Sequence, residues 1–277
     1  MQDFTRCALR NAIAGLLLTT FLQVLSIPLV AAETPAQENG AESGTIREVP
    51  LPGGAKQRAL YARPASPRGA IVMLPGGAGD VGIDDEGGIS HGNNFVVRTR
   101  ALWLDQGYAV IIPDALDGQN MRGLRHSAAY AQVVAALVGF ARAQTPGPVF
   151  LLGTSQGSIA AMNGAAHLSA PVLAGVVLTE SVSRESKSGE TVFDASPGEV
   201  TVPTLIVANR DSACRVAPAE DAPRIAAAMT RAPEVKILYV QGGTSRSRPC
   251  GSLSPHGYFG IEREVVTKIG AWLKAHQ

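Results

Sequence analysis

The feature that most constrains this chain is a regular alternation of short apolar runs with stretches of helical periodicity. Six runs rich in β-branched residues lie at 70–74, 109–113, 149–153, 175–179, 204–208 and 236–240. A strand that is apolar along its whole length, rather than at every second position, is typical of a parallel sheet covered by helices on both faces. Between runs the apolar residues recur with the 3.6-residue period, as at Tyr130, Val133, Val134 and Leu137. The alternation predicts successive βα units.

Two further extended segments come before these units. Residues 45–51 and 57–64 flank the turn formed by Pro52, Gly53 and Gly54, which predicts a β-hairpin. Together with the six runs they predict an eight-stranded, mostly parallel sheet with helices on both faces. The chain of 277 residues shows no internal repeat, and we expect one α/β domain at 45–277. With 45% apolar and 17% charged residues, disorder is excluded as its main state.

The first 32 residues differ from the rest. Arg6 and Arg10 precede an apolar stretch at 12–30 that ends in Val30-Ala31-Ala32, a pattern typical of a secretory signal peptide cleaved after Ala32. The alternative is an uncleaved membrane anchor, since the stretch is nearly long enough to span a bilayer. We expect a signal peptide at 1–32, a flexible leader at 33–44, a secreted or periplasmic protein and no stable membrane insertion after cleavage.

Charge and cysteine content narrow the possible partners. The formal net charge is +1 and no Lys/Arg run is interleaved with aromatic residues, so nucleic acid is not expected as a partner. Cleavage would remove Cys7 and leave Cys214 and Cys250, which in an exported protein indicate one disulfide rather than a metal site. No metal and no cofactor are predicted, because the histidines lack ligand spacing and no nucleotide-binding glycine pattern is present.

One short motif carries the chemistry. Residues 153–157 (GTSQG) match G-x-S-x-G, directly after an apolar run and before a predicted helix at 158–168. In this context Ser155 sits on a sharp strand-to-helix turn, where larger residues in place of Gly153 and Gly157 would clash with neighbouring backbone. The start of the helix presents backbone N–H groups to a developing negative charge. We therefore expect Ser155 to be a nucleophile.

With this motif in this place, residues 45–277 resemble the α/β-hydrolase superfamily, in particular small exported bacterial hydrolases of the dienelactone-hydrolase-like kind. The resemblance implies an α/β-hydrolase fold and a triad in the order Ser, acid, His, with the acid after strand seven and the histidine after strand eight. It also implies a minimal lid, since only residues 180–203 are available between strands six and seven. Dienelactone hydrolases proper use a cysteine nucleophile, whereas this chain has Ser155.

The resemblance assigns the other two triad members. Of the five histidines, only His256 follows the last strand and precedes the last helix, so it is the expected base. Asp211, just beyond strand seven, is the expected acid that orients it. Glu180, at the end of strand six, is the alternative acid, because some relatives place it there.

The same family pattern suggests where an oxyanion would bind. One donor is the N–H of the residue after the nucleophile, here Gln156, and the other comes from the glycine-rich loop after strand three. In that loop Gly77 or its neighbour Gly76 is the expected second donor. We expect Arg98 to pair with a nearby carboxylate and Asn93 or Asn94 to cap the helix that follows.

The activity predicted from these residues is hydrolysis of a carboxylic ester in a small-molecule substrate, through an acyl-enzyme. The same triad also cleaves amides, thioesters or short peptides, so an amidase, a thioesterase or a peptidase is the alternative. A non-catalytic binding protein that kept the hydrolase fold is a second alternative, from a different class. No member of the expected triad is missing, which favours an enzyme.

Overall fold

A computed structural model describes residues 44–277 of the chain. The predicted signal peptide, Cys7 and the predicted leader up to residue 43 lie outside the described residues. Within the described part, none of the helices combines the length and the apolar character that a membrane crossing requires.

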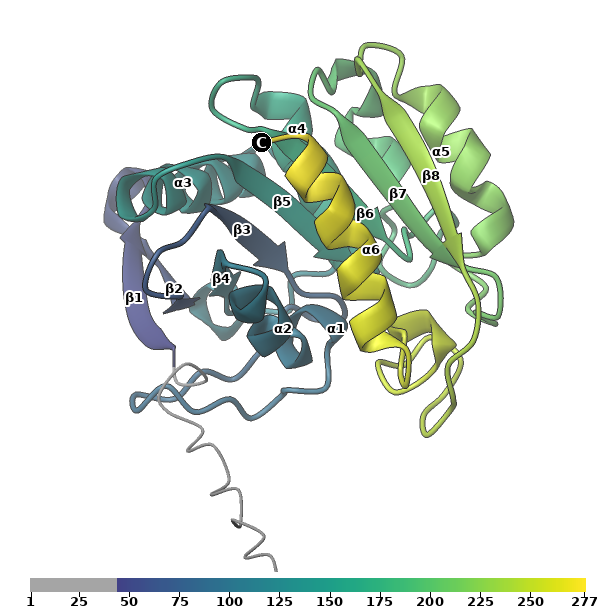
Figure 1. The fold of residues 1–277 in the computed structure, drawn as a ribbon, viewed down its shortest axis with the longest axis horizontal. Helices are drawn as coiled ribbons and strands as arrows, with labels where there is room; N and C mark the ends of the chain where they lie inside the picture. The colour runs from purple at the N-terminus through teal and green to yellow at the C-terminus, as the bar shows by residue number, and fades with distance from the viewer. Residues whose placement is uncertain (1–43) are drawn as a thin grey trace, which may run out of the picture. The chain divides into compact units, whose positions relative to one another are not determined.

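An open eight-stranded sheet forms the centre of the domain (Figure 1). The strands lie in the order β1-β2-β4-β3-β5-β6-β7-β8; β1 pairs with β2 and β2 with β4 in antiparallel fashion, and all other neighbours are parallel. Their bounds are β1 Thr45–Pro50, β2 Lys56–Ala62, β3 Gly69–Leu74, β4 Tyr108–Pro113, β5 Val149–Thr154, β6 Gly175–Thr179, β7 Thr204–Asn209 and β8 Val235–Val240. The predicted sheet is thus confirmed, with strand ends shifted by one or two residues.

Helices cover both faces of the sheet. They are α1 Phe95–Arg98, α2 Arg100–Asp105, α3 Ala128–Gln144, α4 Gln156–His167, α5 Ala222–Ala228 and α6 Glu262–Ala275. Apolar residues of α3, α4 and α5 share one buried cluster with one face of the strands, and those of α1, α2 and α6 share another with the opposite face. Figure 1 shows α6 crossing in front of the strands. Two cores of this kind explain why the central strands are apolar at every position.

Helix α4 fits closely against the sheet because its residues are small. It is buried from Gln156 to Ala165, and a Cβ added at Gly164 would run into the side chain of Val134 on α3. Such close packing fixes the direction in which α4 leaves β5. It therefore fixes the turn between them, on which Ser155 lies.

The parallel strands bring several loops to one edge of the sheet. β3, β5, β6, β7 and β8 run in the same direction, so the segments that follow them begin side by side at their carboxyl ends. The expected minimal lid is also seen: between β6 and β7 the chain forms only the short 3₁₀ helices η3 (Val192–Ala195) and η4 (Pro197–Glu199).

Candidate active site

Ser155 occupies the sharp turn that its glycine neighbours predicted. Its backbone has φ +55° and ψ −123°, and α4 begins at the next residue, two residues earlier than expected. A Cβ at Gly153 would run into the backbone of Gly157, and one at Gly157 into the backbone of Leu74. Both glycines are therefore required by close backbone approach, and the turn leaves the Ser155 hydroxyl at the edge of the sheet.

His256 reaches Ser155 from the segment after β8. Its Nε2 lies 3.0 Å from the Ser155 Oγ, and its side chain is almost fully buried. The imidazole is presented by the short 3₁₀ helix η6 (Pro255–Gly257). The distance is that of a hydrogen bond between a nucleophile and its base. Sequence reasoning thus named two residues that the fold brings together although they are 101 positions apart.

The acid that contacts His256 is Glu180. Its Oε2 lies 3.1 Å from the His256 Nδ1, on the opposite side of the ring from Ser155, and only 1% of its side chain is exposed. The other oxygen, Oε1, accepts a hydrogen bond of 2.6 Å from the backbone N–H of Asn209. Glu180 follows β6 directly and has φ +46°, which turns the chain at the end of the strand.

The assignment of Asp211 to this position was wrong. Asp211 lies two residues beyond the end of β7, is exposed, and accepts a hydrogen bond of 2.8 Å from the backbone N–H of Gly242. Its backbone N–H in turn binds the side-chain oxygen of Asn209 at 3.1 Å. Asp211 does lie at the predicted edge of the sheet, but its carboxylate is hydrogen-bonded to the loop after β8 rather than to His256.

Asn209, which sequence reasoning missed, links the acid and the histidine segment. Besides its N–H bond to Glu180, its side-chain nitrogen donates to the carbonyls of Gly242 at 3.0 Å and Pro255 at 2.9 Å. Pro255 directly precedes His256, and Asn209 is fully buried. One signal in the sequence could have identified Asn209: it is the polar residue that ends the apolar run beginning at Leu205.

Arg98 supports the other side of the histidine segment. Its guanidinium donates to the Glu262 carboxylate at 2.8 Å, which confirms the predicted ion pair, and to the carbonyls of Asn93 and Gly257. Gly257 is the residue after His256. Burial lowers the pKa of Arg98, and the Glu262 carboxylate opposes that shift. The helix that Arg98 ends is capped by Asn94, whose side chain accepts from the N–H of Val96, as one of the two predicted caps.

Tyr258, two residues after His256, is fully buried. Its phenol donates to the carbonyl of Val207 at 3.0 Å, and its ring packs edge-on against Phe95. Burial raises the pKa of Tyr258 well above its ordinary value, and the negative charge of Glu180 raises it further. The phenol therefore stays protonated and acts as a donor.

The two loops predicted to bind an oxyanion lie against Ser155. Gln156 begins α4, so its backbone N–H has no acceptor within the helix. A Cβ on Gly76 would lie 2.9 Å from the carbonyl oxygen of Thr154 and 3.1 Å from the Ser155 Cβ, so this loop touches the nucleophile. Gly77 has φ +63°, a conformation that favours glycine. The donor roles of Gln156, Gly76 and Gly77 stay predictions.

A pocket of about 600 Å³ opens at Ser155. Its walls come from the loop after β3, from residues 186–188 between β6 and β7, and from residues 250–252 near the histidine. Arg122, Lys187 and Arg248 bring positive charge to this lining, and Asp80, which pairs with His91 at 3.2 Å, brings negative charge. The pocket is of a size that takes a small molecule.

Cys214 and Cys250 form the predicted disulfide. Cys214 is buried in the segment after β7, and Cys250 lines the pocket in the segment that leads to His256. Cys214 lies in the same segment as Asp211, so the bond would tie the acid to the histidine segment if Asp211 contacted His256. Because Glu180, directly after β6, is the carboxylate at His256, the bond instead joins the histidine segment to a neighbouring loop.

Two other titratable residues in nearby loops, Asp114 and His126, have structural contacts. Asp114 accepts hydrogen bonds from the backbone N–H groups of Val81, Gly82, Ile83 and Ala115, so it stabilises the loop after β3. His126 contacts Glu190, and neither residue touches Ser155. Within residues 44–277, no group of three or more His, Cys, Asp or Glu side chains is placed to hold a metal ion.

Comparison with known proteins agrees with this architecture. No family model and no curated protein matches the chain. Among solved structures, an esterase of Pyrococcus furiosus is similar, with TM-score 0.59 and 12% identity over 85% of this chain and 92% of that one. A dienelactone hydrolase of Anabaena variabilis has TM-score 0.55 and 15% identity over 84% and 99%. Esterase 2 of Thermogutta terrifontis has TM-score 0.58 and 14% identity over 84% and 96%. With the sheet order and the turn at Ser155, these likenesses show that the chain has the α/β-hydrolase fold.

Proposed function

We propose that this chain is a serine hydrolase that cleaves carboxylic esters through an acyl-enzyme, with Ser155 as nucleophile, His256 as base and Glu180 as the orienting acid. One observation carries the proposal: the two nitrogens of one buried imidazole contact the Ser155 hydroxyl at 3.0 Å and the Glu180 carboxylate at 3.1 Å. Hydrolases and esterases among the similar structures support the same class of reaction.

In the proposed mechanism each group has one task. As the Ser155 Oγ attacks the ester carbonyl, the His256 Nε2 takes the hydroxyl proton, and the carbonyl oxygen becomes an oxyanion that accepts from the N–H of Gln156 and of Gly76 or Gly77. The C–O bond to the alcohol then breaks, and His256 returns the proton to the leaving oxygen. Water attacks the acyl-enzyme by the same route and releases the acid. Glu180 holds the imidazole in the required tautomer and stabilises its cation.

We propose small, soluble esters as substrates and export as the setting. A pocket of about 600 Å³ and a lid of two short 3₁₀ helices support short or medium acyl chains, without activation at an oil–water interface. The disulfide supports the oxidising compartment that the apolar N-terminal segment predicts. Esters, amides and thioesters of the same acids, assayed side by side, distinguish the bond classes.

The test is the Ser155→Ala variant. Loss of a triad member costs on the order of 10⁴ to 10⁶ in rate, so hydrolysis of p-nitrophenyl esters should fall to background, and a fluorophosphonate probe should label the wild type but not the variant. The thermal midpoint should change little, because the hydroxyl is partly exposed. Ester hydrolysis near the wild-type rate in the folded variant would remove Ser155 from the mechanism.

A further inference from the structure

A buried arginine lies behind the loop that faces the oxyanion. The segment 121–127, between β4 and α3, packs along residues 75–79, where the backbone N–H of Met121 donates to the carbonyl of Ala78 at 2.9 Å. From the same segment the Arg125 guanidinium donates to the carbonyl of Pro75 at 3.4 Å through Nη2. That nitrogen also lies 3.0 Å from the position of a Cβ on Gly79. The guanidinium therefore lies close to both ends of the loop, at Pro75 and at Gly79.

The Arg125 guanidinium is buried, which is unusual for a positively charged group. Only 1% of Arg125 is exposed, and within residues 44–277 its Nη1 is buried without a hydrogen-bond partner. Burial lowers the pKa of Arg125, with Tyr130 and Glu190 opposing the shift, yet a guanidinium stays protonated in proteins. A buried ion costs several kcal/mol unless hydrogen bonds and an opposite charge compensate it.

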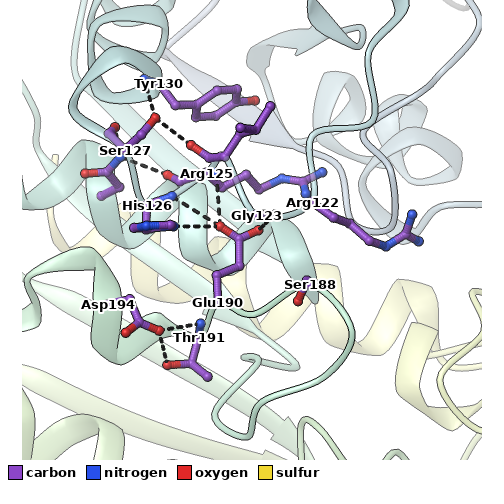
Figure 2. Close-up of polar contacts among 12 residues, drawn as sticks. Arg122, Gly123, Arg125, His126, Ser127, Tyr130, Ser188, Glu190, Thr191 and Asp194 are labelled. Atoms are coloured by element: carbon purple, nitrogen blue, oxygen red, sulfur yellow. Dashed lines mark hydrogen bonds and ion pairs between the residues drawn. The ribbon is translucent and has the colours of Figure 1, made fainter.

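Glu190 holds the backbone around this arginine rather than its side chain. Figure 2 shows the Glu190 carboxylate facing the backbone of residues 123–126. It accepts from the N–H groups of Gly123 at 2.8 Å, Arg125 at 3.0 Å and His126 at 3.3 Å, and from the His126 ring at 3.1 Å. Its side chain is fully buried. The Glu190 oxygens thus bond backbone N–H groups and the His126 ring. The Arg125 guanidinium instead donates to the Pro75 carbonyl in the loop at 75–79.

Helix α4, which begins directly after Ser155, also holds the segment 121–127. The Asn163 side chain, on α4, donates to the carbonyls of Arg125 and Ser127 at 2.8 Å each. The backbone of Arg125 is thus tied to α4 and to Glu190, while its side chain reaches the loop that contains Gly76 and Gly77. One residue connects the two elements expected to supply the oxyanion donors.

We infer that Arg125 is a positioning residue for the oxyanion: it holds residues 75–79 at a fixed distance from Ser155 and places a buried positive charge behind the donor loop. This rests on the proposed function. Charges and dipoles that are fixed before reaction stabilise developing negative charge with little reorganisation, and they act more strongly where water is excluded. The inferred role concerns the transition state, so it is expected to appear in kcat rather than in KM.

Two variants test the role. Arg125→Met keeps the length of the side chain and removes the charge, whereas Arg125→Lys keeps the charge and loses the planar donor group. Removing a direct oxyanion donor costs about 10²–10³ in kcat, so a supporting residue should cost about 10- to 100-fold in Arg125→Met with KM changed less than threefold. Arg125→Lys should recover part of the loss. Arg142→Met, an exposed arginine near the end of α3, is the matched control.

A boronic acid that forms a tetrahedral adduct with Ser155 provides the decisive readout. If Arg125 supports the oxyanion loop, boronate affinity falls by about the same factor as kcat. A folded Arg125→Met variant with wild-type kcat, or one that loses thermal stability with boronate affinity unchanged, would make Arg125 a purely structural residue. If Arg125→Met does not fold, Arg125→Gln, which removes the charge but keeps a planar donor group, decides by the same two measurements, and a wild-type kcat in it overturns the inference.

The wild type is measured first, which separates this inference from the proposed function. A wild type that neither hydrolyses esters nor reacts with a fluorophosphonate at Ser155 would refute the proposed function. An active wild type whose Arg125 variants keep kcat and boronate affinity would refute only the role of Arg125.

Discussion

The neighbouring strands β6 and β7 both end at the edge of the sheet where Ser155 lies, and an acidic side chain follows each. Glu180 comes directly after β6, is buried, and meets the His256 imidazole at 3.1 Å. Asp211 lies two residues beyond Asn209, in the turn that follows β7; it is exposed and accepts a hydrogen bond from the backbone N–H of Gly242. Burial and hydrogen bonds thus distinguish the two carboxylates, although both follow neighbouring strands.

Asn209 explains why the two carboxylates differ. It ends β7, and its backbone N–H donates to the Glu180 Oε1 at 2.6 Å. Its side chain donates to the carbonyl of Pro255, next to His256, so one residue bonds both Glu180 and the histidine segment. The contact between Glu180 and His256 therefore depends on β6 and β7 together.

Among changes at the two carboxylates, the largest effect is expected from Glu180→Gln. The amide keeps the size of the side chain but removes the charge, so it no longer stabilises the imidazolium or fixes its tautomer, and kcat should fall about 10⁴-fold. Steady-state hydrolysis of a p-nitrophenyl ester at neutral pH measures the loss, with fluorophosphonate labelling of Ser155 slowed in parallel. A loss of less than tenfold would mean that the contact seen here is not the catalytic one.

The sequence predicted the sheet, Ser155 and His256 because each follows from a local pattern in a definite place. The central strands β3, β4 and β5 are buried along their whole length, and close backbone approach requires the glycines around Ser155. The acid could not be predicted in the same way, since residues after β6 and after β7 both reach the edge. Its choice depends on the positive φ of Glu180 and on the N–H of Asn209, 29 residues away.

The contacts of Arg125 with the loop at 75–79 left no local pattern in the sequence. Arg125 and Glu190 are 65 residues apart, and each is an ordinary charged residue in a segment without regular structure. Only the packed chain shows that both are buried and that the first touches the loop at 75–79. Contacts of this kind are decided by tertiary packing rather than by composition or spacing.

A smaller effect is expected from Glu180→Asp. This variant keeps the negative charge but shortens the side chain by one methylene group. The shorter carboxylate cannot reach both Asn209 N–H and His256 Nδ1 as Glu180 does at 2.6 and 3.1 Å. Misplacement of about 1 Å costs about 10²-fold, so kcat should fall by about that factor. The variant should fall between wild type and Glu180→Gln in the same assay; a rate equal to wild type would show that the reach of this carboxylate does not matter.

The disulfide should have a smaller effect on turnover than either change at Glu180. Cys214 and Cys250 close a loop with a sequence separation of 36, so the Cys214→Ser/Cys250→Ser double variant should lose about 3–4 kcal/mol of unfolding free energy in the chain-entropy picture. Below its new thermal midpoint, kcat should fall about tenfold, because the segment leading to His256 loses one attachment while Asn209 and Arg98 still hold it.

Two measurements check that prediction. Non-reducing peptide mapping of protein from an oxidising compartment should recover the two cysteines in one linked peptide pair, and denaturant unfolding should give the stability difference. Two free, alkylatable thiols in the folded protein would contradict the bond. A double variant with an unchanged free energy of unfolding would show that the disulfide does not stabilise the fold.

The smallest effect is expected from Asp211→Asn. The asparagine side-chain oxygen still accepts from the N–H of Gly242, which Asp211 binds at 2.8 Å, and the side chain is exposed, so the loss of charge is screened by water. Exposed substitutions usually change stability by less than about 0.5 kcal/mol, and kcat/KM should stay within about threefold of wild type. Asp211→Ala, which removes the acceptor, should loosen the loop after β8 and lower the thermal midpoint without approaching the loss in Glu180→Gln. If Asp211→Asn instead lost activity on the scale of 10⁴ while Glu180→Gln kept it, the acid would have to act from β7, and the histidine segment would need a different arrangement in the working enzyme.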